Sequence, residues 1–482
     1  MYQGRIFDTK VQYLKYRVLR EVVRLASRGL KELSEGISLI PESIVPGKRP
    51  TMRCCVFKER AILAERVQRA VGGHRQNKNI IEVIDIACDD CPVGGYTVTE
   101  SCRGCIARRC KEACRRQAIS FDNRQKAQID NDLCVNCGLC AKVCPYSAIV
   151  DMKRPCMQSC KVNAISMNED YLAVIDEEKC VRCGACVYRC PFGAIVDKSS
   201  VLDVLYLLKE SRGNEAYRVY AMVAPSVSSQ FVYAKLGQVI SGLKKCGFYE
   251  VAEVALGADM VAFSESKELA EKGFLLSSCC PAFVRFVHNE FPGMVEHLSH
   301  SLSPMAEMAK RIKQRDPKCR IVFIGPCTAK KMEVKYDSVS PYVDSAITFE
   351  ELQAMFDGLE IDLQELPETA LNDASYYGRI FARSGGLTDA MRQGLKEHGL
   401  DGSFKLNPIV CSGLEECRKA LLLASHGKLQ NNFVEGMACE GGCISGAGCL
   451  THGDKDARQV DKYGSESTAS SISAAVDAYF AK

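Results

Sequence analysis

Three short cysteine segments carry the strongest chemical signal in this chain: Ser277-Ser278-Cys279-Cys280-Pro281, Gly325-Pro326-Cys327-Thr328-Ala329-Lys330-Lys331-Met332-Glu333 and Glu435-Gly436-Met437-Ala438-Cys439-Glu440-Gly441-Gly442-Cys443-Ile444-Ser445-Gly446-Ala447-Gly448. Each segment follows a short apolar run that is typical of a buried strand. A single cysteine is most often a buried thiol that packs as a small apolar side chain. Three such segments at predicted strand ends, each with Pro or Gly beside the thiol, instead indicate ligands of a site in an open α/β sheet.

Composition sets the wider limits. The chain has 482 residues, 28 cysteines and no tryptophan. This length suggests about three domains. The start of the sequence does not resemble a signal peptide, and no run of about 18 apolar residues predicts a membrane span. We therefore expect a cytoplasmic protein whose thiols bind metal, because disulfides are rare in a reducing compartment.

A second cysteine pattern repeats with an offset of 46 residues. Cys134-x2-Cys137-x2-Cys140-x3-Cys144-Pro145 recurs as Cys180-x2-Cys183-x2-Cys186-x3-Cys190-Pro191, and the pairs Cys110-x3-Cys114 and Cys156-x3-Cys160 precede the two copies. In 4Fe-4S proteins three closely spaced thiolates bind one cluster, and the fourth, before proline, binds its neighbour. The pattern therefore predicts a duplicated ferredoxin-like unit, with a disulfide framework as the weaker explanation.

The separation of the motifs resembles that of bacterial two-cluster ferredoxins and suggests which thiols share a cluster. One cluster would use Cys114, Cys134, Cys137 and Cys140, and another Cys160, Cys180, Cys183 and Cys186. A third would use Cys102, Cys105, Cys110 and Cys144, although Arg115 stands where proline is usual. By elimination, Cys88, Cys91, Cys156 and Cys190 remain for a fourth. Sharing of Cys190 with the Cys134 motif is an open alternative, so we expect two to four accessory clusters.

The three segments quoted first resemble the signature motifs of the iron-only (FeFe) hydrogenases. The resemblance implies an H-cluster, in which a 4Fe-4S cubane is joined to a di-iron unit that carries carbon monoxide, cyanide and a dithiolate bridge. Its cubane ligands would be Cys280, Cys327, Cys439 and Cys443, and Cys443 would also bridge to the di-iron unit. Other positions match residues that contact the di-iron unit, with Lys330 and Ser226 as cyanide donors: Lys330, Ser226, Ala224, Pro225 and Met437.

A proton relay is implied by the same resemblance. Cys279 matches the thiol beside the bridge amine, and Glu265, Ser299 and Glu268 match the positions that lead outward. Taken alone, Glu265 and Glu268 are three residues apart and resemble a solvated helix pair. With the thiol and the hydroxyl also present, a complete relay is the better interpretation.

Several positions depart from the usual motifs of that family: Gly325 replaces methionine, Met305 glutamine and Phe283 tryptophan, and Ala447 and Cys449 alter the final glycine run. These departures resemble a divergent, group B-like branch. They predict a reshaped pocket around the di-iron unit.

The resemblance implies an α/β catalytic domain over residues 205–455, with two parallel-sheet lobes around the active-site cluster. We expect a basic, mainly helical region over 1–95, a small α+β ferredoxin-like domain over 96–200, and a C-terminal helix or tail over 456–482. Residues 1–80 contain 17 Lys or Arg against 7 Asp or Glu. Most of these charges are expected on solvated helix faces, a docking surface for an acidic ferredoxin is the sharper alternative, and no nucleic-acid motif accompanies them.

These features predict a hydrogenase that reversibly converts protons and electrons to hydrogen. Electrons would pass between the accessory clusters and ferredoxin, since no flavin or nicotinamide motif is present, and maturation proteins would insert the di-iron unit. A hydrogen-sensing protein with slow turnover is one alternative. An Fe-S assembly factor without the di-iron unit is another, although Cys279, Lys330 and Cys443 are all retained.

Overall fold

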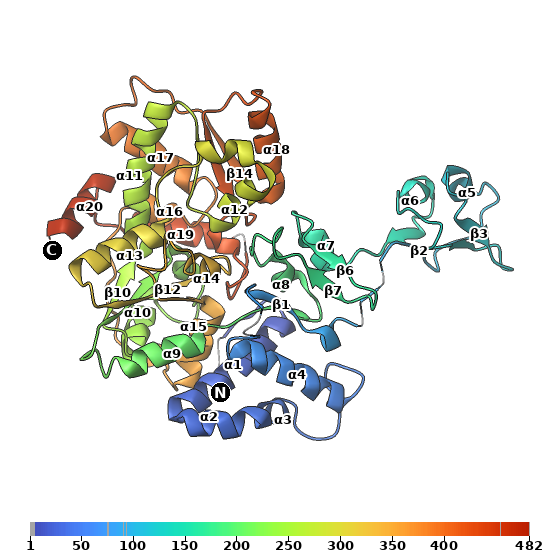
Figure 1. Cartoon of the computed structure of the whole chain (residues 1–482), viewed down its shortest axis with the longest axis horizontal. Helices are drawn as coiled ribbons and strands as arrows, with labels where there is room; N and C mark the ends of the chain where they lie inside the picture. Colours follow the sequence, from blue (N-terminus) through green and yellow to red (C-terminus); the bar gives the residue numbers. More distant parts are fainter. Residues whose placement is uncertain (1–4, 75–76, 90, 93, 454, 482) are drawn as a thin grey trace.

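Two parallel sheets form the core of a large domain on the left of Figure 1. The computed structural model describes residues 5–74, 77–89, 91–92, 94–453 and 455–481. The first sheet, in the order β10-β9-β12-β13, contains β9 (Val219–Val223), β10 (Glu250–Glu253), β12 (Arg320–Gly325) and β13 (Ser345–Thr348). The second, in the order β11-β15-β14, contains β11 (Leu275–Leu276), β14 (Pro408–Ser412) and β15 (Phe433–Met437). Every pairing within these two sheets is parallel.

Helices surround the two sheets (Figure 1). They are α9 (Val201–Glu210), α10 (Leu236–Lys245), α11 (Val254–Lys272), α12 (Pro281–Glu290), α13 (Pro304–Arg315), α14 (Lys330–Glu333), α15 (Phe349–Gly358), α16 (Tyr376–Ile380), α17 (Gly386–Glu397), α18 (Leu414–Ser425), α19 (Lys455–Ser465) and α20 (Ile472–Ala481). Strand β9 is apolar throughout and all its residues are buried, because a parallel strand in such a sheet is covered on both faces. The predicted parallel sheets with helices are confirmed.

Two small α+β units follow one another toward the right of Figure 1. The inner unit contains β1 (Ile81–Val83) paired with β8 (Ile195–Asp197), β6 (Ile165–Met167) paired with β7 (Ala173–Ile175), α7 (Pro155–Ser159) and α8 (Ala185–Arg189). The outer unit contains β2 (Tyr96–Val98) paired with β5 (Ile149–Asp151), β3 (Ile119–Phe121) paired with β4 (Ala127–Ile129), α5 (Arg109–Ala113) and α6 (Leu139–Val143).

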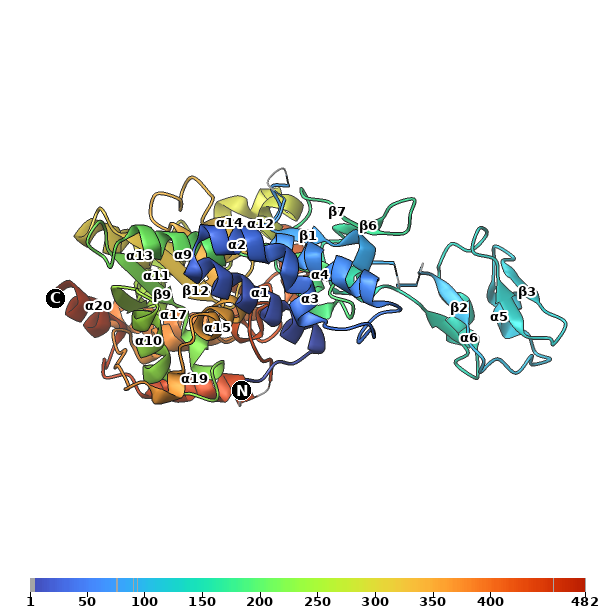
Figure 2. The ribbon, with the colours of Figure 1, turned by 90° about the horizontal axis from the view of Figure 1, so that it is seen from below.

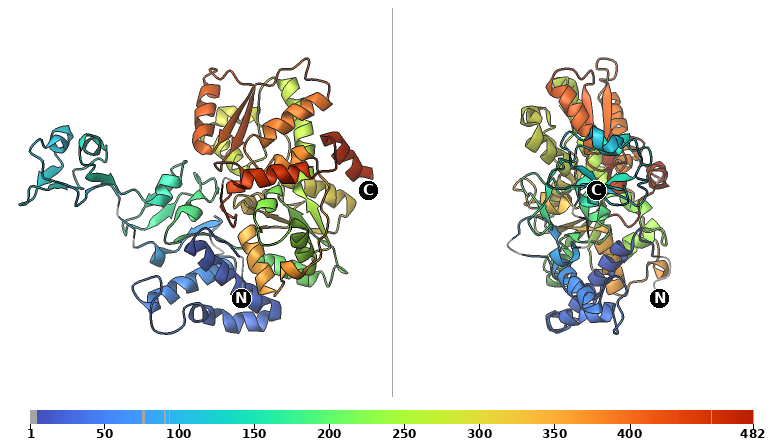
Figure 3. Two further views of the ribbon diagram at one scale, coloured as in Figure 1. Left: turned by 180° about the vertical axis from the view of Figure 1, so that it is seen from behind. Right: turned by 90° about the vertical axis from the view of Figure 1, so that its right-hand side faces the viewer.

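The outer unit is an insertion in the inner one. Strand β1 precedes the whole outer unit in sequence, yet it pairs with β8, which follows it. The outer unit projects away from the rest of the molecule in Figures 1 and 2 and in the left view of Figure 3. The duplicated pattern in the sequence therefore corresponds to two nested units rather than to one small domain.

The N-terminal region is helical, as expected, with α1 (Lys10–Arg28), α2 (Leu30–Gly36), α3 (Ile40–Ile44) and α4 (Val56–Ala70). Helix α1 packs against α15 of the large domain. Among the described Lys and Arg residues of positions 1–80, only six are exposed: Lys10, Arg28, Lys31, Lys48, Arg49 and Lys78. The expectation that most of these charges lie on solvated helix faces is wrong, because many of them pair inside the protein: Arg5 with Asp357, Lys15 with Asp197 and Glu350, and Arg69 with Glu82.

None of the helices in the described part of the chain combines the length and the apolar composition needed to cross a membrane.

Candidate metal centre

Four thiols meet between the two sheets of the large domain. Cys280 follows β11, Cys327 follows β12, and Cys439 and Cys443 follow β15. Burial raises the pKa of Cys327 to about 11 and that of Cys443 to about 12, and the neighbouring thiol of Cys280 raises both further. The thiols of Cys327, Cys280 and Cys443 likewise raise the pKa of Cys439, after burial. The carboxyl ends of parallel strands thus bring all four predicted cubane ligands to one place.

These four thiols equal in number the ligands of a 4Fe-4S cubane. Among the described residues, no three His, Cys, Asp or Glu side chains are close enough together to hold a single metal ion. A cubane presents four separate iron corners, so its thiolate ligands lie further apart than the ligands of one ion. Soft thiolate ligands in a buried setting are the donors that Fe-S clusters use.

A cavity of about 90 Å³ adjoins this thiol group. Its wall includes Cys443, Cys279, Ser226, Lys330 and Met437, together with other predicted pocket residues such as Ala224 and Pro225. The Ser226 hydroxyl and the Lys330 ammonium are buried, and neither has a hydrogen-bond partner within the protein. Unpaired buried donors are rare because they lose their bonds to water. The cavity therefore fits a small group that supplies acceptors to both donors, as the cyanides of a di-iron unit would.

Lys330 owes its charge to one carboxylate. Its Nζ lies 2.5 Å from Glu333 Oε2, but the two groups are not oriented as a hydrogen bond. Burial lowers the pKa of Lys330. Glu333, Cys327 and Cys279 raise it, and their combined effect is larger than that of burial, so the ammonium form is favoured. Its donors remain available to a group in the cavity.

The predicted relay residues form a row in space that leads from the cavity toward the surface. Burial raises the pKa of Glu265 to about 7, although Ser299 and Ser278 act in the opposite direction, and Ser278 Oγ donates to Glu265 Oε1 at 3.1 Å. Burial also raises the pKa of Cys279, and the carboxylate of Glu265 raises it further. Ser299 Oγ donates to Glu268 Oε2 at 2.8 Å. The four side chains are thus brought together in the order Cys279, Glu265, Ser299, Glu268.

The outer end of this row reaches solvent. Lys272 Nζ lies 2.7 Å from Glu268 Oε1, and the backbone N–H of His300 donates to the same carboxylate at 3.2 Å. His300 Nδ1 lies 3.2 Å from Glu268 Oε1, and the His300 side chain is 79% exposed. The outer carboxylate, Glu268, therefore lies beside the exposed His300 side chain, where water can supply protons.

The accessory thiols form four groups in the structure. Cys102, Cys105, Cys110 and Cys144 surround one small cavity in the outer unit. The thiols of Cys134 and Cys114 raise the pKa of Cys140, after burial, which brings these members of the second group together, and the two groups share one core cluster of the outer unit. The thiols of Cys180 and Cys160 raise the pKa of Cys183, after burial, and in the same way Cys190, Cys88 and Cys91 surround Cys156. Each group matches one of the four predicted sets, and their occupation by clusters stays a prediction.

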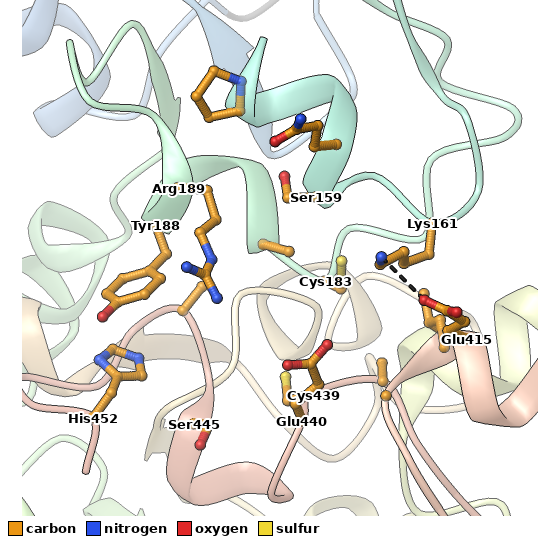
Figure 4. Close-up of a pocket in the computed structure, with 17 residues that line it drawn as sticks. Ser159, Lys161, Cys183, Tyr188, Arg189, Glu415, Cys439, Glu440, Ser445 and His452 are labelled. Atoms are coloured by element: carbon orange, nitrogen blue, oxygen red, sulfur yellow. Dashed lines mark hydrogen bonds and ion pairs between the residues drawn. The ribbon is translucent and has the colours of Figure 1, made fainter. Parts of the chain in front are cut away.

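One inner group lies next to the large domain. The thiol of Cys280 is among those that raise the pKa of Cys183. The thiol of Cys183 in turn raises the pKa of Cys439. Cys183 and Cys439 both line a cavity of about 630 Å³ between the inner unit and the large domain, shown in Figure 4. Close contact here leaves no room at Gly184, whose added Cβ would lie 2.6 Å from both Ala447 Cβ and Thr328 Oγ1.

The departures from the usual motifs have local structural correlates. Phe323 occupies the space that a side chain at Gly325 would need, since its ring lies 2.6 Å from the position of an added Cβ. Met305 lines the di-iron cavity, and Phe283 is fully buried. Cys449 is buried, and its Sγ lies 3.3 Å from the carbonyl oxygen of Ile444.

Sequence reasoning missed several polar groups around these sites. Ser278 was adjacent to the predicted thiols, and Glu333 ends the second quoted segment, so their proximity in sequence was a usable signal. Arg154 and Arg66 gave no signal, because they reach their thiol neighbours only through the fold. They are described below.

Comparison with known proteins agrees with the geometry. Residues 217–447 match the family described as iron only hydrogenase large subunit, C-terminal domain, residues 101–148 match a 4Fe-4S dicluster domain, and residues 173–196 match a 4Fe-4S binding domain. Iron hydrogenase 1 of Clostridium pasteurianum is 28% identical over 271 residues, which are 47% of this chain and 47% of that protein. The cytosolic Fe-S cluster assembly factor NAR1 of Kluyveromyces lactis is 36% identical over 93 residues, 19% of this chain and 20% of that protein.

Among solved structures, the FeFe-hydrogenase HydA1 from Chlamydomonas reinhardtii matches with a TM-score of 0.46 and 20% identity, over 56% of this chain and 90% of that one. The chain spans about half the length of Iron hydrogenase 1. The family matches cover the large domain and parts of both small units. Residues 217–447 therefore belong to the iron-only hydrogenase large-subunit family, and ferredoxin-type iron-sulfur domains precede them in this divergent chain.

Proposed function

We propose that this protein is a hydrogenase that reversibly converts two protons and two electrons to hydrogen at an H-cluster. One observation carries the proposal: a cavity beside four converging thiols is bounded by two buried donors without a hydrogen-bond partner in the protein, Ser226 Oγ and Lys330 Nζ, of which only Lys330 has an ion pair, with Glu333. When bound, the di-iron unit would supply the site where protons and electrons combine. Cys443 would join it to the cubane, and Ser226 and Lys330 would orient it through its cyanides.

The chain's own residues would deliver the protons. Glu268 would take up a proton near His300 and Lys272 and pass it across the 2.8 Å bond to Ser299 Oγ. Glu265, with a pKa near 7, can both accept and release a proton at neutral pH. Cys279 Sγ would then hold the proton at the cavity wall, where the apolar residues around it exclude bulk water.

Electrons would reach the same site by a different route, through the accessory clusters. The thiol groups of the outer unit are furthest from the large domain, and Cys137 there is exposed (Figure 1). Cys183 is the accessory thiol next to Cys439 and Cys280. We propose a soluble low-potential carrier such as ferredoxin as the partner at the outer unit. Maturation proteins would supply the di-iron unit, and the reducing cytoplasm is the compartment that suits 28 free cysteines.

Two other functions use the same fold. A hydrogen sensor would retain the cofactor but turn over slowly. An Fe-S assembly factor would lack the di-iron unit, and the identity with NAR1 over 93 residues is the observation that favours it. The cavity favours the hydrogenase, because a protein without the di-iron unit would have no use for two buried donors that lack hydrogen-bond acceptors there.

Infrared spectroscopy separates these functions. After maturation with the assembly enzymes of an iron-only hydrogenase, the protein should show absorption bands of metal-bound carbon monoxide and cyanide and should evolve hydrogen with a chemical reductant. Bands with slow turnover would indicate the sensor. The absence of bands from a protein with a full complement of cubane iron would overturn the proposal in favour of the assembly factor.

A further inference from the structure

The inner unit contains a group of four cysteines whose members are separated in sequence by the inserted outer unit. Cys88 and Cys91 precede the outer unit in sequence, whereas Cys156 and Cys190 follow it. Antiparallel pairing of β1 with β8, extended by the bond from Ile84 N to Ala194 O at 2.7 Å, brings the first pair to the second. Cys88, Cys91 and Cys156 lie outside every segment that matched a known family. No continuous motif reveals the site, because its halves are separated by the outer unit.

Arg154 lies directly against this thiol group. Its side chain is 2% exposed, and its Nη1 donates to Cys88 Sγ at 3.4 Å. The other two nitrogens donate to backbone oxygens, Nε to Pro92 at 2.8 Å and Nη2 to Tyr171 at 2.6 Å. Arg154 has no carboxylate partner among the described residues. The sulfur atoms are therefore the anionic groups that its charge faces.

A second guanidinium, from Arg66 on α4, approaches the group from the N-terminal helices. Arg66 is buried, its Nη2 donates to the oxygen of Phe192 at 3.0 Å, and its Nε has no partner. Burial lowers the pKa of Arg66 to about 10, while Cys190 acts in the opposite direction. Within the part of the chain that the structure describes, no carboxylate pairs with Arg66. Burying an uncompensated charge is costly, so an anionic group nearby is required.

We propose that Cys88, Cys91, Cys156 and Cys190 hold a 4Fe-4S cluster, and that Arg154 and Arg66 raise its reduction potential. The inference deepens the proposed electron path and rests on it. Reduction adds one electron to the cluster and breaks no bond, so the cluster and its thiolates become more negative. A buried cation and an N–H···S hydrogen bond stabilise the more negative form more strongly, because the attraction grows with charge and is weakly screened away from water.

The position of the site gives this charge a role. Cys156 is one of the thiols that raise the pKa of Cys186, so this group adjoins the one that contains Cys183. The site therefore lies between the insertion points of the outer unit and the group next to the large domain. An electron arriving from the outer unit would be retained here until the next step can accept it.

The test uses the full-length, iron-replete protein prepared without the di-iron unit, so that only the 4Fe-4S clusters give signals. A Cys88→Ser/Cys91→Ser variant should lose about four iron atoms. It should also lose one wave in a potentiometric titration followed by electron paramagnetic resonance, and that wave identifies the cluster. Arg154→Gln should shift the same wave to a potential that is lower by about 59 mV. For one electron, this shift corresponds to an equilibrium constant for reduction that is about tenfold smaller.

Two further variants make the test specific. Arg66→Gln should shift the wave in the same direction, and Arg154→Lys, which keeps the charge, should restore most of the potential. Lys153→Gln is the matched control: it removes a neighbouring cation whose side chain is 60% exposed, and it should leave the wave unchanged because water screens it.

Each outcome bears on a different claim. Full iron content in the double cysteine variant would overturn the cluster site. An unmoved wave in both Arg154→Gln and Arg66→Gln would overturn the role of the arginines and leave the site in place. If Arg154→Gln loses the cluster, the titration of Arg66→Gln decides. The infrared bands of the di-iron unit report on the hydrogenase proposal independently of all these results.

Discussion

At the residue scale, the di-iron cavity is marked by what its polar atoms lack. Ser226 Oγ, Lys330 Nζ and one oxygen of Glu265 are buried without hydrogen-bond partners. Leaving such a group unpaired costs about 1–3 kcal/mol, and more when it is charged. Three unpaired groups around one predicted site are consistent with a bound group that completes their hydrogen bonds.

Lys330→Gln tests the role of the ammonium. The four thiolates are unchanged in this variant, so the cubane should assemble, whereas retention of the di-iron unit should fall by roughly 10- to 100-fold. Total iron and the intensity of the carbon monoxide and cyanide bands measure the two parts separately. Lys335→Gln, five residues further along the chain, is the control and should behave as the wild type. Equal band intensity in Lys330→Gln would contradict the assignment.

Cys279→Ala tests the end of the relay. The variant should bind the complete cofactor, because Cys279 is not expected to ligate iron, and it should lose roughly 10²- to 10⁴-fold in hydrogen evolution. Activity per bound di-iron unit is the quantity to measure, with infrared bands for loading. Cys246→Ala, which changes another thiol far from the predicted site, should retain full activity. A loaded Cys279→Ala protein with wild-type turnover would exclude the thiol as the last proton donor.

Much of the candidate site could be predicted at this scale, because the ligand thiols occur in short segments that resemble the signature motifs of the iron-only hydrogenases. Cys280, Cys327, Cys439 and Cys443 were placed together in this way, and the structure brings them together. Arg154 could not be identified from such a segment. Its partner Cys88 is 66 residues away, and only the fold joins them.

At the scale of elements, a buried ion-pair network joins three parts of the chain. Lys331 of α14 lies 2.8 Å from Asp197 of β8 and 2.7 Å from Glu351 of α15. Lys15 of α1 also pairs with Asp197. Burial alone would raise the pKa of Asp197, but Lys15 and Lys331 lower it overall. The network therefore fixes the inner unit and the N-terminal helix against the large domain at neutral pH.

Lys331→Met should loosen this junction. Removing one partner leaves buried carboxylates uncompensated, which typically costs about 3–5 kcal/mol. Because the pKa of Asp197 is lowered in the folded protein, its contribution exists above the pKa of an unfolded aspartate and disappears as the pH falls through the folded value. Thermal unfolding at pH 7 should occur at a clearly lower midpoint in the variant, and the difference should shrink in strong acid.

Lys335→Met provides the comparison for Lys331→Met, since Lys335 has no ion pair among the described residues, and its midpoint should stay near that of the wild type. Equal midpoints for Lys331→Met and the wild type at pH 7 would show that the junction does not depend on the network.

Element pairing marks the limit of sequence prediction here. The 46-residue repeat predicts two similar units, and the structure contains them. The repeat gives no sign that one unit is inserted in the other. The insertion shows only in the pairing of β1 with β8, which are separated in sequence by the whole outer unit. Three-residue strands carry too little periodicity to identify such distant partners. The N-terminal charges were misplaced for a similar reason, since their acidic partners lie in other parts of the chain.

At the scale of the whole molecule, the outer unit is a separable extension of the rest. It projects from the inner unit in Figures 1 and 2 and in the left view of Figure 3, whereas the N-terminal helices pack against the large domain. Removing the N-terminal helices would expose the buried face of α15, where Gly358 packs against Val23 of α1. The outer unit can be removed with less disturbance, because its core residues form a cluster of their own.

Deletion of the outer unit therefore tests the electron path. Tyr96 and Asp151 are direct partners in the pairing of β2 with β5, so the chain ends at residues 95 and 152 lie close together and a short Gly-Ser linker can join them. The shortened protein should contain about eight fewer iron atoms, since two clusters are lost. Hydrogen evolution with a small artificial reductant should persist, because every residue assigned to the H-cluster and the relay lies in the large domain. Ferredoxin-driven evolution should be lost. Wild-type rates with ferredoxin in a folded, fully matured deletion protein would show that electrons enter at the inner unit or the large domain, and the outer unit would then have another role.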